Sequence, residues 1–370
     1  MLGIRRPTII EWLSSKTYED DRGWKKNKPH KAEHSEVEAS RIRTLKEKRI
    51  KEKYFVGSDY VQMDYVRQYP NELIPSTWFI DKTIREAKLQ TKKPKGKKNV
   101  GGSKYLLFPA ESIKNLGEIH QSADFIGKKY IAGRTEPINV FSSAYYSPFK
   151  LFQIKRVMAE KARCAIEVLK VQWQTFPIPD VFRIDNGLQF RGTASGKRSV
   201  GTFLCFLLNL SVTPLFGSPS KPWTNPAIEG HNRIFNEKIW SNNFFKNPEQ
   251  IDIECNRFNQ ESLEYFQYKY ASFLDNKQFR YLGGTIDPKS DKLVTTKNRK
   301  IYFIRFAESN EFKEPAYIDI LNEKVLIPEQ YTHQFVFAEW DLEKEILSIY
   351  SEFEQITTLV KQMDFKLNMV

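Results

Sequence analysis

The sequence predicts a multidomain protein with an α-helical N-terminus, a mixed α/β core and a small C-terminal β-barrel. Three observations lead to this prediction. Apolar residues recur at helical spacing over roughly the first ninety positions. Strand-like runs and amphipathic helices then alternate from residue 112, and short strand patterns recur after residue 273. The 370 residues are 40% hydrophobic, which is enough material for more than one core.

Residues 1–89 contain four stretches with the pattern of short helices: RPTIIEWLSSKTYE, EVEASRIRTLKEKR, GSDYVQMDYVRQYP and IPSTWFIDKTIREAKL. We expect the third to be capped by Ser58 or Asp59 and the fourth by Ser76. The first and fourth share a start signal, a Trp-containing apolar run and basic residues, as recognition helices of helix-turn-helix units do. We therefore interpret 1–89 as a tandem helix-turn-helix DNA-binding region whose first unit is short at its start. Ordinary small-bundle helices are the alternative.

The positive charge is concentrated near the N-terminus. The formal net charge is +13, and residues 1–119 hold 26 of the 58 Lys and Arg but only 16 of the 45 Asp and Glu. A bias of this kind favours a polyanionic partner, because each neutralised phosphate releases counterions. Residues 90–111 form a basic linker that can follow a phosphate backbone. The expected DNA contacts are Arg5, Arg6, Lys25, Lys26, Ser76, Thr77, Lys82, Arg85, Lys92, Lys93, Lys95, Lys97 and Lys98.

Residues 112–273 predict a five-stranded mixed sheet with flanking helices. The strand patterns are EIHQSADFIGKKYIAG, PINVFSSAYYS, FKLFQIKRV, PDVFRIDNG and VTPLFGSP. Helical patterns follow the third, fourth and fifth, so the order is β-β-β-α-β-α-β-α. Further strand patterns, GTIDPKSDKLVTT, KIYFIRF, AYIDILNEKVLIP and HQFVFAEWD, predict a small barrel over 274–340. We expect the charged segment 341–370 to be a helical tail.

Three carboxylates stand out in the core. Asp124 interrupts an apolar strand, where a buried charge is costly without a partner. Asp185 ends the fourth strand, at an Asp-Asn-Gly sequence that alone indicates only a turn. Glu229 lies one turn into the helix that begins at Asn225 and Pro226. The first and fourth strands should be neighbours, so the three acids can converge around a divalent cation such as Mg²⁺ or Mn²⁺.

The stretches FRIDNGLQF and TPLFGSPSKPWTNPAIEGHNRIFN resemble the catalytic core of the DDE transposase and retroviral integrase superfamily, which has a ribonuclease-H-like fold. The second stretch carries the run Pro219, Pro222, Asn225 and Glu229. With the helix-turn-helix region, the basic linker and the barrel, nearly the whole chain resembles bacterial insertion-sequence transposases. The resemblance implies that Asp124, Asp185 and Glu229 are the catalytic triad and hold two Mg²⁺ or Mn²⁺ ions.

The resemblance also implies a function. It predicts cleavage at the ends of a mobile element and strand transfer into target DNA, on double-stranded DNA, by a homodimer or a higher homo-oligomer. Arg233 matches a basic position of relatives and is an expected DNA contact. The expected positioning residues are Asn186, Asn225, His231 and Asn232. No stretch has the length and apolarity of a membrane span, and we expect a bacterial, cytoplasmic, nucleoid-associated protein.

The sequence departs from the superfamily pattern at three places. The 43 residues between Asp185 and Glu229 are more than usual, and we expect the surplus in a loop near the site, at 191–201. Gln121 stands where many relatives have Trp, and Asn236 where Lys or Arg is frequent. Two alternatives stay open: a metal-dependent nuclease of the same fold without strand transfer, and a catalytically inactive DNA-binding relative, which the short first helix-turn-helix unit would fit.

Overall fold

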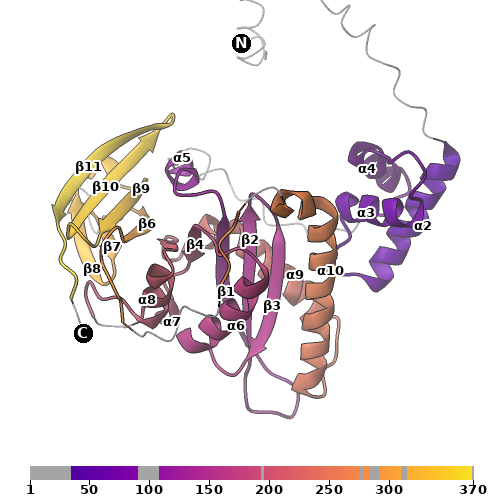
Figure 1. The fold of residues 1–370 in the computed structure, drawn as a ribbon, viewed down its shortest axis with the longest axis horizontal. Coiled ribbons are helices and arrows are strands. Elements are labelled where there is room, and N and C mark those ends of the chain that lie inside the picture. Colours follow the sequence, from indigo (N-terminus) through magenta and orange to yellow (C-terminus); the bar gives the residue numbers. More distant parts are fainter. Residues whose placement is uncertain are drawn as a thin grey trace, which may run out of the picture.

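The protein is represented by a computed structural model that describes residues 35–90, 108–192, 196–275, 278–283, 292–309 and 315–368 (Figure 1). The first predicted helix lies outside the described residues. So do nine of the expected DNA contacts: Arg5, Arg6, Lys25, Lys26, Lys92, Lys93, Lys95, Lys97 and Lys98.

The other three helices predicted near the N-terminus are confirmed. They are α2 (Glu36–Glu52), α3 (Ser58–Gln68) and α4 (Thr77–Glu86), and they pack around Ile42, Val61 and Ile80. Ser76 caps α4 as expected, since its side chain accepts a hydrogen bond from Phe79 N. The cap expected for α3 was wrong: Gly57 occupies that position, and both Ser58 and Asp59 lie inside the helix.

The five strands predicted for the core are all present in the predicted order, but the sheet has nine strands rather than five. It contains β1 (His120–Lys129), β2 (Ile138–Ser147), β3 (Leu151–Val157), β4 (Val181–Ile184) and β5 (Thr213–Phe216). β2 pairs antiparallel with both β1 and β3, whereas β4 pairs parallel with both β1 and β5. The expected adjacency of the first and fourth strands is therefore present, and it brings their carboxyl ends to one edge.

Helices cover both faces of this sheet. A large core packs α6 (Ala162–Thr175) and α8 (Thr202–Asn209) against one face. On the other face lie α9 (Pro226–Ile234), its π-helical continuation Phe235–Trp240, and α10 (Pro248–Asp275). The shorter elements are α5 (Ala110–Lys114), α7 (Leu188–Arg191) and the single 3₁₀ turns Pro222–Thr224 and Glu329–Tyr331.

The C-terminal strands do not form the predicted barrel. They are β6 (Lys300–Phe306), β7 (Ala316–Ile320), β8 (Glu323–Ile327), β9 (Phe335–Asp341), β10 (Ile346–Phe353) and β11 (Ile356–Asp364). β6 pairs parallel with β5, and β9, β10 and β11 follow, which gives one sheet ordered β11-β10-β9-β6-β5-β4-β1-β2-β3. Because one edge of β6 is paired with the core, these strands extend the core sheet, and the described residues contain no closed barrel. β7 and β8 form a separate hairpin.

The predicted helical tail was also wrong, because 341–370 contains β10 and β11. Four of its charged residues, Asp341, Glu343, Lys344 and Glu345, lie at the β9–β10 turn, where Asp341 accepts hydrogen bonds from Glu343 N and Lys344 N. The strand expected at GTIDPKSDKLVTT is absent over its described part, 292–296, and the preceding 284–291 lie outside the described residues.

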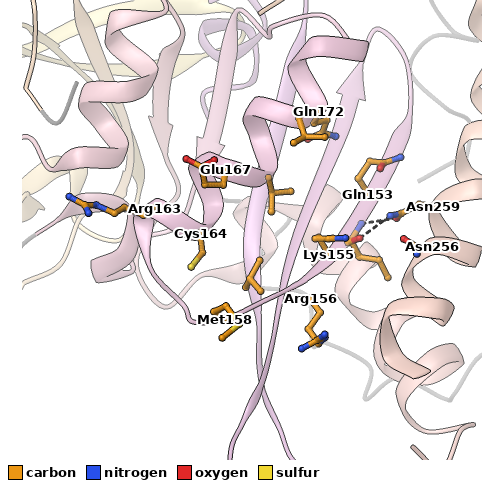
Figure 2. A pocket seen from close by; sticks show the side chains of 14 residues that line it. Gln153, Lys155, Arg156, Met158, Arg163, Cys164, Glu167, Gln172, Asn256 and Asn259 are labelled. Atoms are coloured by element: carbon orange, nitrogen blue, oxygen red, sulfur yellow. Dashed lines mark hydrogen bonds between the residues drawn. The ribbon is translucent and has the colours of Figure 1, made fainter. Parts of the chain in front are cut away.

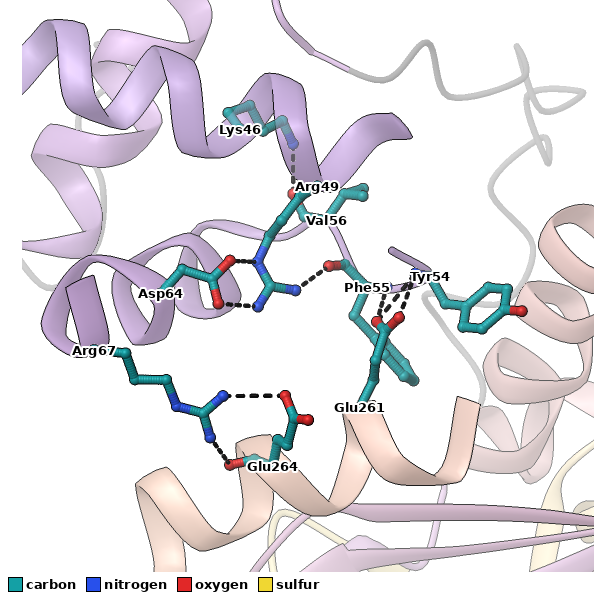
Figure 3. A network of polar contacts seen from close by, with 9 residues as sticks. All are labelled: Lys46, Arg49, Tyr54, Phe55, Val56, Asp64, Arg67, Glu261 and Glu264. Carbon is teal, nitrogen blue, oxygen red and sulfur yellow. Dashed lines mark hydrogen bonds and ion pairs between the residues drawn. The ribbon is translucent and has the colours of Figure 1, made fainter. Parts of the chain in front are cut away.

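The N-terminal helices are held against the core by α10 (Figure 3). Glu261 accepts hydrogen bonds from the backbone N–H groups of Tyr54 and Phe55, and Arg67 pairs with Glu264 at 3.0 Å. Arg49 of α2 joins the segment between α2 and α3 to α3 itself, because it donates hydrogen bonds to Phe55 O and to the Asp64 carboxylate. Helices α2 and α3 therefore have a defined position beside the core.

Candidate active site

A cavity of about 290 Å³ lies where β4 and β5 end and α9 begins, and it is lined by Asp124, Asp185 and Glu229. Asp124 comes from β1, Asp185 follows β4, and Glu229 lies in the first turn of α9. The structure therefore brings together the three acids that the sequence singled out, through the strand adjacency that it predicted.

Asp124 is the most enclosed of the three acids. Its Oδ2 accepts a hydrogen bond of 2.8 Å from Asn232 Nδ2, one turn beyond Glu229 on α9. Burial, together with the charges of Asp185 and Glu229, raises the pKa of Asp124 to about 7, although the hydrogen bonds to this carboxyl oppose the rise. Near neutral pH, this carboxyl is therefore poised between its neutral and charged forms.

Asp185 occupies the turn that its sequence predicted. Its Oδ1 accepts a hydrogen bond of 2.9 Å from Gly187 N, and its other oxygen makes no such bond within the described residues. Partial desolvation raises the pKa of Asp185, and the hydrogen bond from Gly187 N opposes this rise. The turn and the acid site are therefore compatible: the turn uses one carboxylate oxygen and leaves the other facing the cavity.

Glu229 is presented by the proline-rich approach to α9. Pro226 occupies the first turn of the helix, and Asn225 precedes it without a side-chain capping bond. Thr224, which is buried, accepts from Ser218 N and donates to Lys221 O, and so it folds the approach into a compact loop along the cavity. The loop fixes the direction from which Glu229 enters the site.

His231 lies behind the cavity and supports the sheet. Its Nδ1 lies 2.8 Å from Ser142 Oγ, and its ring stacks on Phe152. Burial lowers the pKa of His231 to about 3, so the ring stays neutral at physiological pH. This environment suits a positioning residue better than a general acid or base. Asn232, next to it, is the residue that touches an acid directly.

The cavity offers oxygen donors of the kind that a divalent cation binds. No group of three His, Cys, Asp or Glu side chains within the described ranges is already gathered as a metal cluster. However, Asn225 Oδ1 is buried at the cavity and lacks a hydrogen-bond partner among the described residues. Three carboxylates and a free amide oxygen are hard oxygen donors, which suit Mg²⁺ or Mn²⁺. The residues present therefore fit such an ion, provided the carboxylates draw together on binding.

The described DNA-contact candidates lie in two places. Lys82 and Arg85 are exposed on α4, and Thr77 is half-buried at its start. Ser76 uses its side-chain oxygen as the helix cap. Arg233 is exposed on α9, 3.9 Å from Glu237 and one turn past Glu229.

Two departures from the superfamily pattern have structural explanations. Gln121 is buried, accepts a hydrogen bond from Trp173 Nε1 at 2.8 Å and donates to Gln172 Oε1, so the polar side chain is fully used at this buried position. The described part of the 191–201 loop leads away to the β7–β8 hairpin. There Arg191 donates to Asn322, and Arg198 pairs with Glu323.

A second, larger cavity of about 620 Å³ lies between β3, α6 and α10 (Figure 2). None of the three acids lines it, so it is separate from the acid site. The neighbouring edge of β3 is covered by α10, because Ser262 and Asn259 accept hydrogen bonds from Phe152 N and Ile154 N.

Sequence reasoning missed Arg305 in β6. Arg305 is buried and donates a hydrogen bond of 2.8 Å to Asn186 Oδ1, directly beside Asp185. The signal was present in KIYFIRF, where Ile301, Phe303 and Arg305 alternate on one buried face. A charged residue at an inward position of a strand indicates a candidate functional residue, and Arg305 in β6 shows this pattern just as Asp124 in β1 does.

Comparison with known proteins gives little. No family model and no curated protein matches the chain. Among solved structures, it is similar to a chain of a simian T-cell lymphotropic virus intasome in complex with PP2A regulatory subunit B56 gamma. The identity is 12%, the TM-score is 0.31, and the match covers 80% of this chain and 92% of that chain. This TM-score is too low for the likeness to indicate a shared fold or activity.

Proposed function

We propose that the protein is a DDE-type polynucleotidyl transferase, a transposase or integrase that cleaves the ends of a DNA element and joins them to target DNA. The observation that supports this most is the shared cavity of Asp124, Asp185 and Glu229, which come from three separate segments. The spacing of FRIDNGLQF and the proline-rich run before Glu229 supports it independently, because both resemble this superfamily.

In this proposal, Asp124, Asp185 and Glu229 hold two Mg²⁺ or Mn²⁺ ions, with Asn225 as a further oxygen donor. The bound ions would supply a nucleophilic oxygen and stabilise the leaving oxygen of the phosphodiester. Asn232 keeps one oxygen of Asp124 in place, and Asn186 does the same for the turn that carries Asp185. The chain itself therefore orients the carboxylates, and the DNA brings the reacting phosphate.

In this proposal, DNA binds to basic residues of the N-terminal helices and of α9. The N-terminal helices would bind an element end through Thr77, Lys82 and Arg85, while Arg233 would contact DNA near the acids. Two ends must be paired for transposition, so we propose at least a homodimer on DNA. The described helices include none with the length and apolarity needed to span a membrane. A bacterial cytoplasmic location at the nucleoid is part of the proposal.

The test is a joining assay with end-containing DNA, a supercoiled target plasmid and Mg²⁺. Asp185→Asn and Glu229→Gln should each reduce joined products at least about a hundredfold while DNA binding stays near wild type, because phosphoryl transfer depends on positioned charge. Glu249→Gln, an exposed change in the first turn of α10, is the control and should be neutral. Full joining by both site variants would refute the triad. Cleavage by the wild type without joined products would favour the nuclease alternative.

A further inference from the structure

Arg305 is a buried guanidinium in β6, at the junction between the C-terminal strands and the core. Only 2% of its surface is exposed. Its four hydrogen bonds within the described residues all go to neutral oxygens: Asp319 O at 2.5 Å, Ile304 O at 2.9 Å, Gly217 O at 2.8 Å and Asn186 Oδ1 at 2.8 Å. No carboxylate forms an ion pair with Arg305 within the described residues, and the nearby charge of Asp319 offsets only part of the cost of burying the cation.

Two of these bonds end at the acid site. Asn186 follows Asp185 directly, and its Nδ2 donates a hydrogen bond of 2.7 Å to the same Gly217 O that Arg305 contacts. Gly217 N in turn donates to Ile184 O, the residue before Asp185. Arg305, Asn186 and Gly217 therefore form a closed ring of hydrogen bonds beneath the Asp185 turn.

The same C-terminal segment holds the other side of this turn. Arg191, in the short helix after the turn, donates to Asn322 Oδ1 at the tip of the β7–β8 hairpin. Phe306 N, next to Arg305, donates to Ser218 Oγ on the loop that leads to Glu229. Contacts from β6 and from the β7–β8 hairpin thus reach two segments: the one after β4, which carries Asp185, and the one after β5, which leads to Glu229.

We propose that Arg305 is a positioning residue for the acid site, and that the C-terminal strands complete this site by holding the Asp185 turn from below. The planar fork of the guanidinium is needed, since it reaches Asn186 and Gly217 while it stays anchored to Asp319 O; a lysine ammonium cannot span these directions. Burial lowers the pKa of Arg305 to about 9, so the side chain is still charged at neutral pH. The assignment of this role rests on the proposed function of the acids.

The experiment uses the full chain with Arg305→Lys, Arg305→Met and Asn186→Ala. Lys300→Met, at the other end of the same strand, is the matched control, because Lys300 pairs with Glu339 far from the ring. Hydrogen exchange of metal-free protein should be at least about tenfold faster at the Gly187 and Ser218 amides in the three variants, relative to amides of β10. Mn²⁺ binding, followed by the paramagnetic resonance of free Mn²⁺, should weaken about tenfold or more, as expected when a supporting hydrogen bond is lost.

Unchanged exchange at these amides together with unchanged Mn²⁺ affinity in Arg305→Lys and Asn186→Ala would overturn the proposal. If Arg305→Met fails to fold, Arg305→Lys and Asn186→Ala still test the proposal. Arg305→Lys keeps the charge, and Asn186→Ala changes a residue on an open turn. If the wild type binds no Mn²⁺, the proposed function fails, and the exchange rates alone still test whether Arg305 holds the turn. If Lys300→Met loses as much amide protection and Mn²⁺ affinity as the Arg305 variants, Arg305 has only a general stabilising role. That result would also overturn the proposal.

Discussion

The N-terminal helices and the C-terminal strands are attached to the same core in different ways. The N-terminal helices contact α10 through side chains: Glu261 under the Tyr54 and Phe55 backbone, and Arg67 against Glu264. The C-terminal strands continue the core sheet through backbone pairing of β5 with β6. A side-chain interface can open without unfolding either part, whereas a shared sheet cannot be separated without breaking its ladder.

This difference can be compared with the proposed function. Helices that search for an element end gain from an attachment that can loosen, since DNA binding changes their surroundings. Carboxylates that must meet a metal gain from a rigid support, because small displacements weaken ligation. The two attachments therefore agree with the roles that we propose for the parts they join.

The largest expected effect comes from breaking the C-terminal attachment at Trp340. This side chain is fully buried in β9, and its Nε1 donates to Phe365 O. Trp340→Ala should lower the free energy of unfolding by about 3–5 kcal/mol. Amides of β1 and β10 should lose protection together in native-state hydrogen exchange. Loss confined to β10 would show that the C-terminal strands form an independent unit.

A second prediction concerns the pH dependence of the shared core. The pKa of Asp124 is about 7 in the folded chain against an ordinary value of 3.8. The folded state therefore binds this proton more tightly than the unfolded state, and the stabilisation is lost as pH rises from about 4 to about 7. In metal-free buffer, wild-type unfolding free energy should fall over this range by an amount up to about 4 kcal/mol. Urea unfolding of Asp124→Asn should show a much smaller fall, and an identical fall would contradict the assigned pKa.

A smaller and local effect is expected at the N-terminal attachment. Glu261 is buried and serves two backbone N–H groups, so Glu261→Ala leaves both without that acceptor. The cost should be about 1–3 kcal/mol and should appear as opening of the N-terminal helices. Limited proteolysis around residues 53–57 should accelerate while β1 exchange stays unchanged. Simultaneous loss of β1 protection would mean that this attachment, too, belongs to the core.

Sequence reasoning reached the core and its acids because both depend on local patterns. Alternation located β1 to β5, and the carboxylate of Asp124 within an apolar strand marked the site. The barrel was wrong because pairing partners are not encoded locally: β6 carries the same alternation whether its neighbour is β5 or another C-terminal strand. The helical tail was wrong because the charges of 341–370 were given more weight than the alternating buried residues of β10, such as Leu347 and Ile349. The alternation of KIYFIRF marks Arg305 as an inward-facing residue, but it does not reveal its role, because its partners Asn186 and Gly217 are about ninety to one hundred and twenty residues away in the chain.

The smallest expected effect is at the surface pair between Arg67 and Glu264. The Arg67 side chain is 44% exposed and that of Glu264 27%, so solvent and salt screen their attraction. Arg67→Ala should cost at most about 1 kcal/mol of the N-terminal attachment, and the difference from wild type should vanish in high salt. Proteolysis rates near residues 53–57, measured at low and high ionic strength, give the comparison, with Glu261→Ala as the salt-insensitive reference. A salt-independent loss as large as that of Glu261→Ala would contradict this prediction. It would show that Arg67 contributes as much to the N-terminal attachment as the buried backbone hydrogen bonds of Glu261 do.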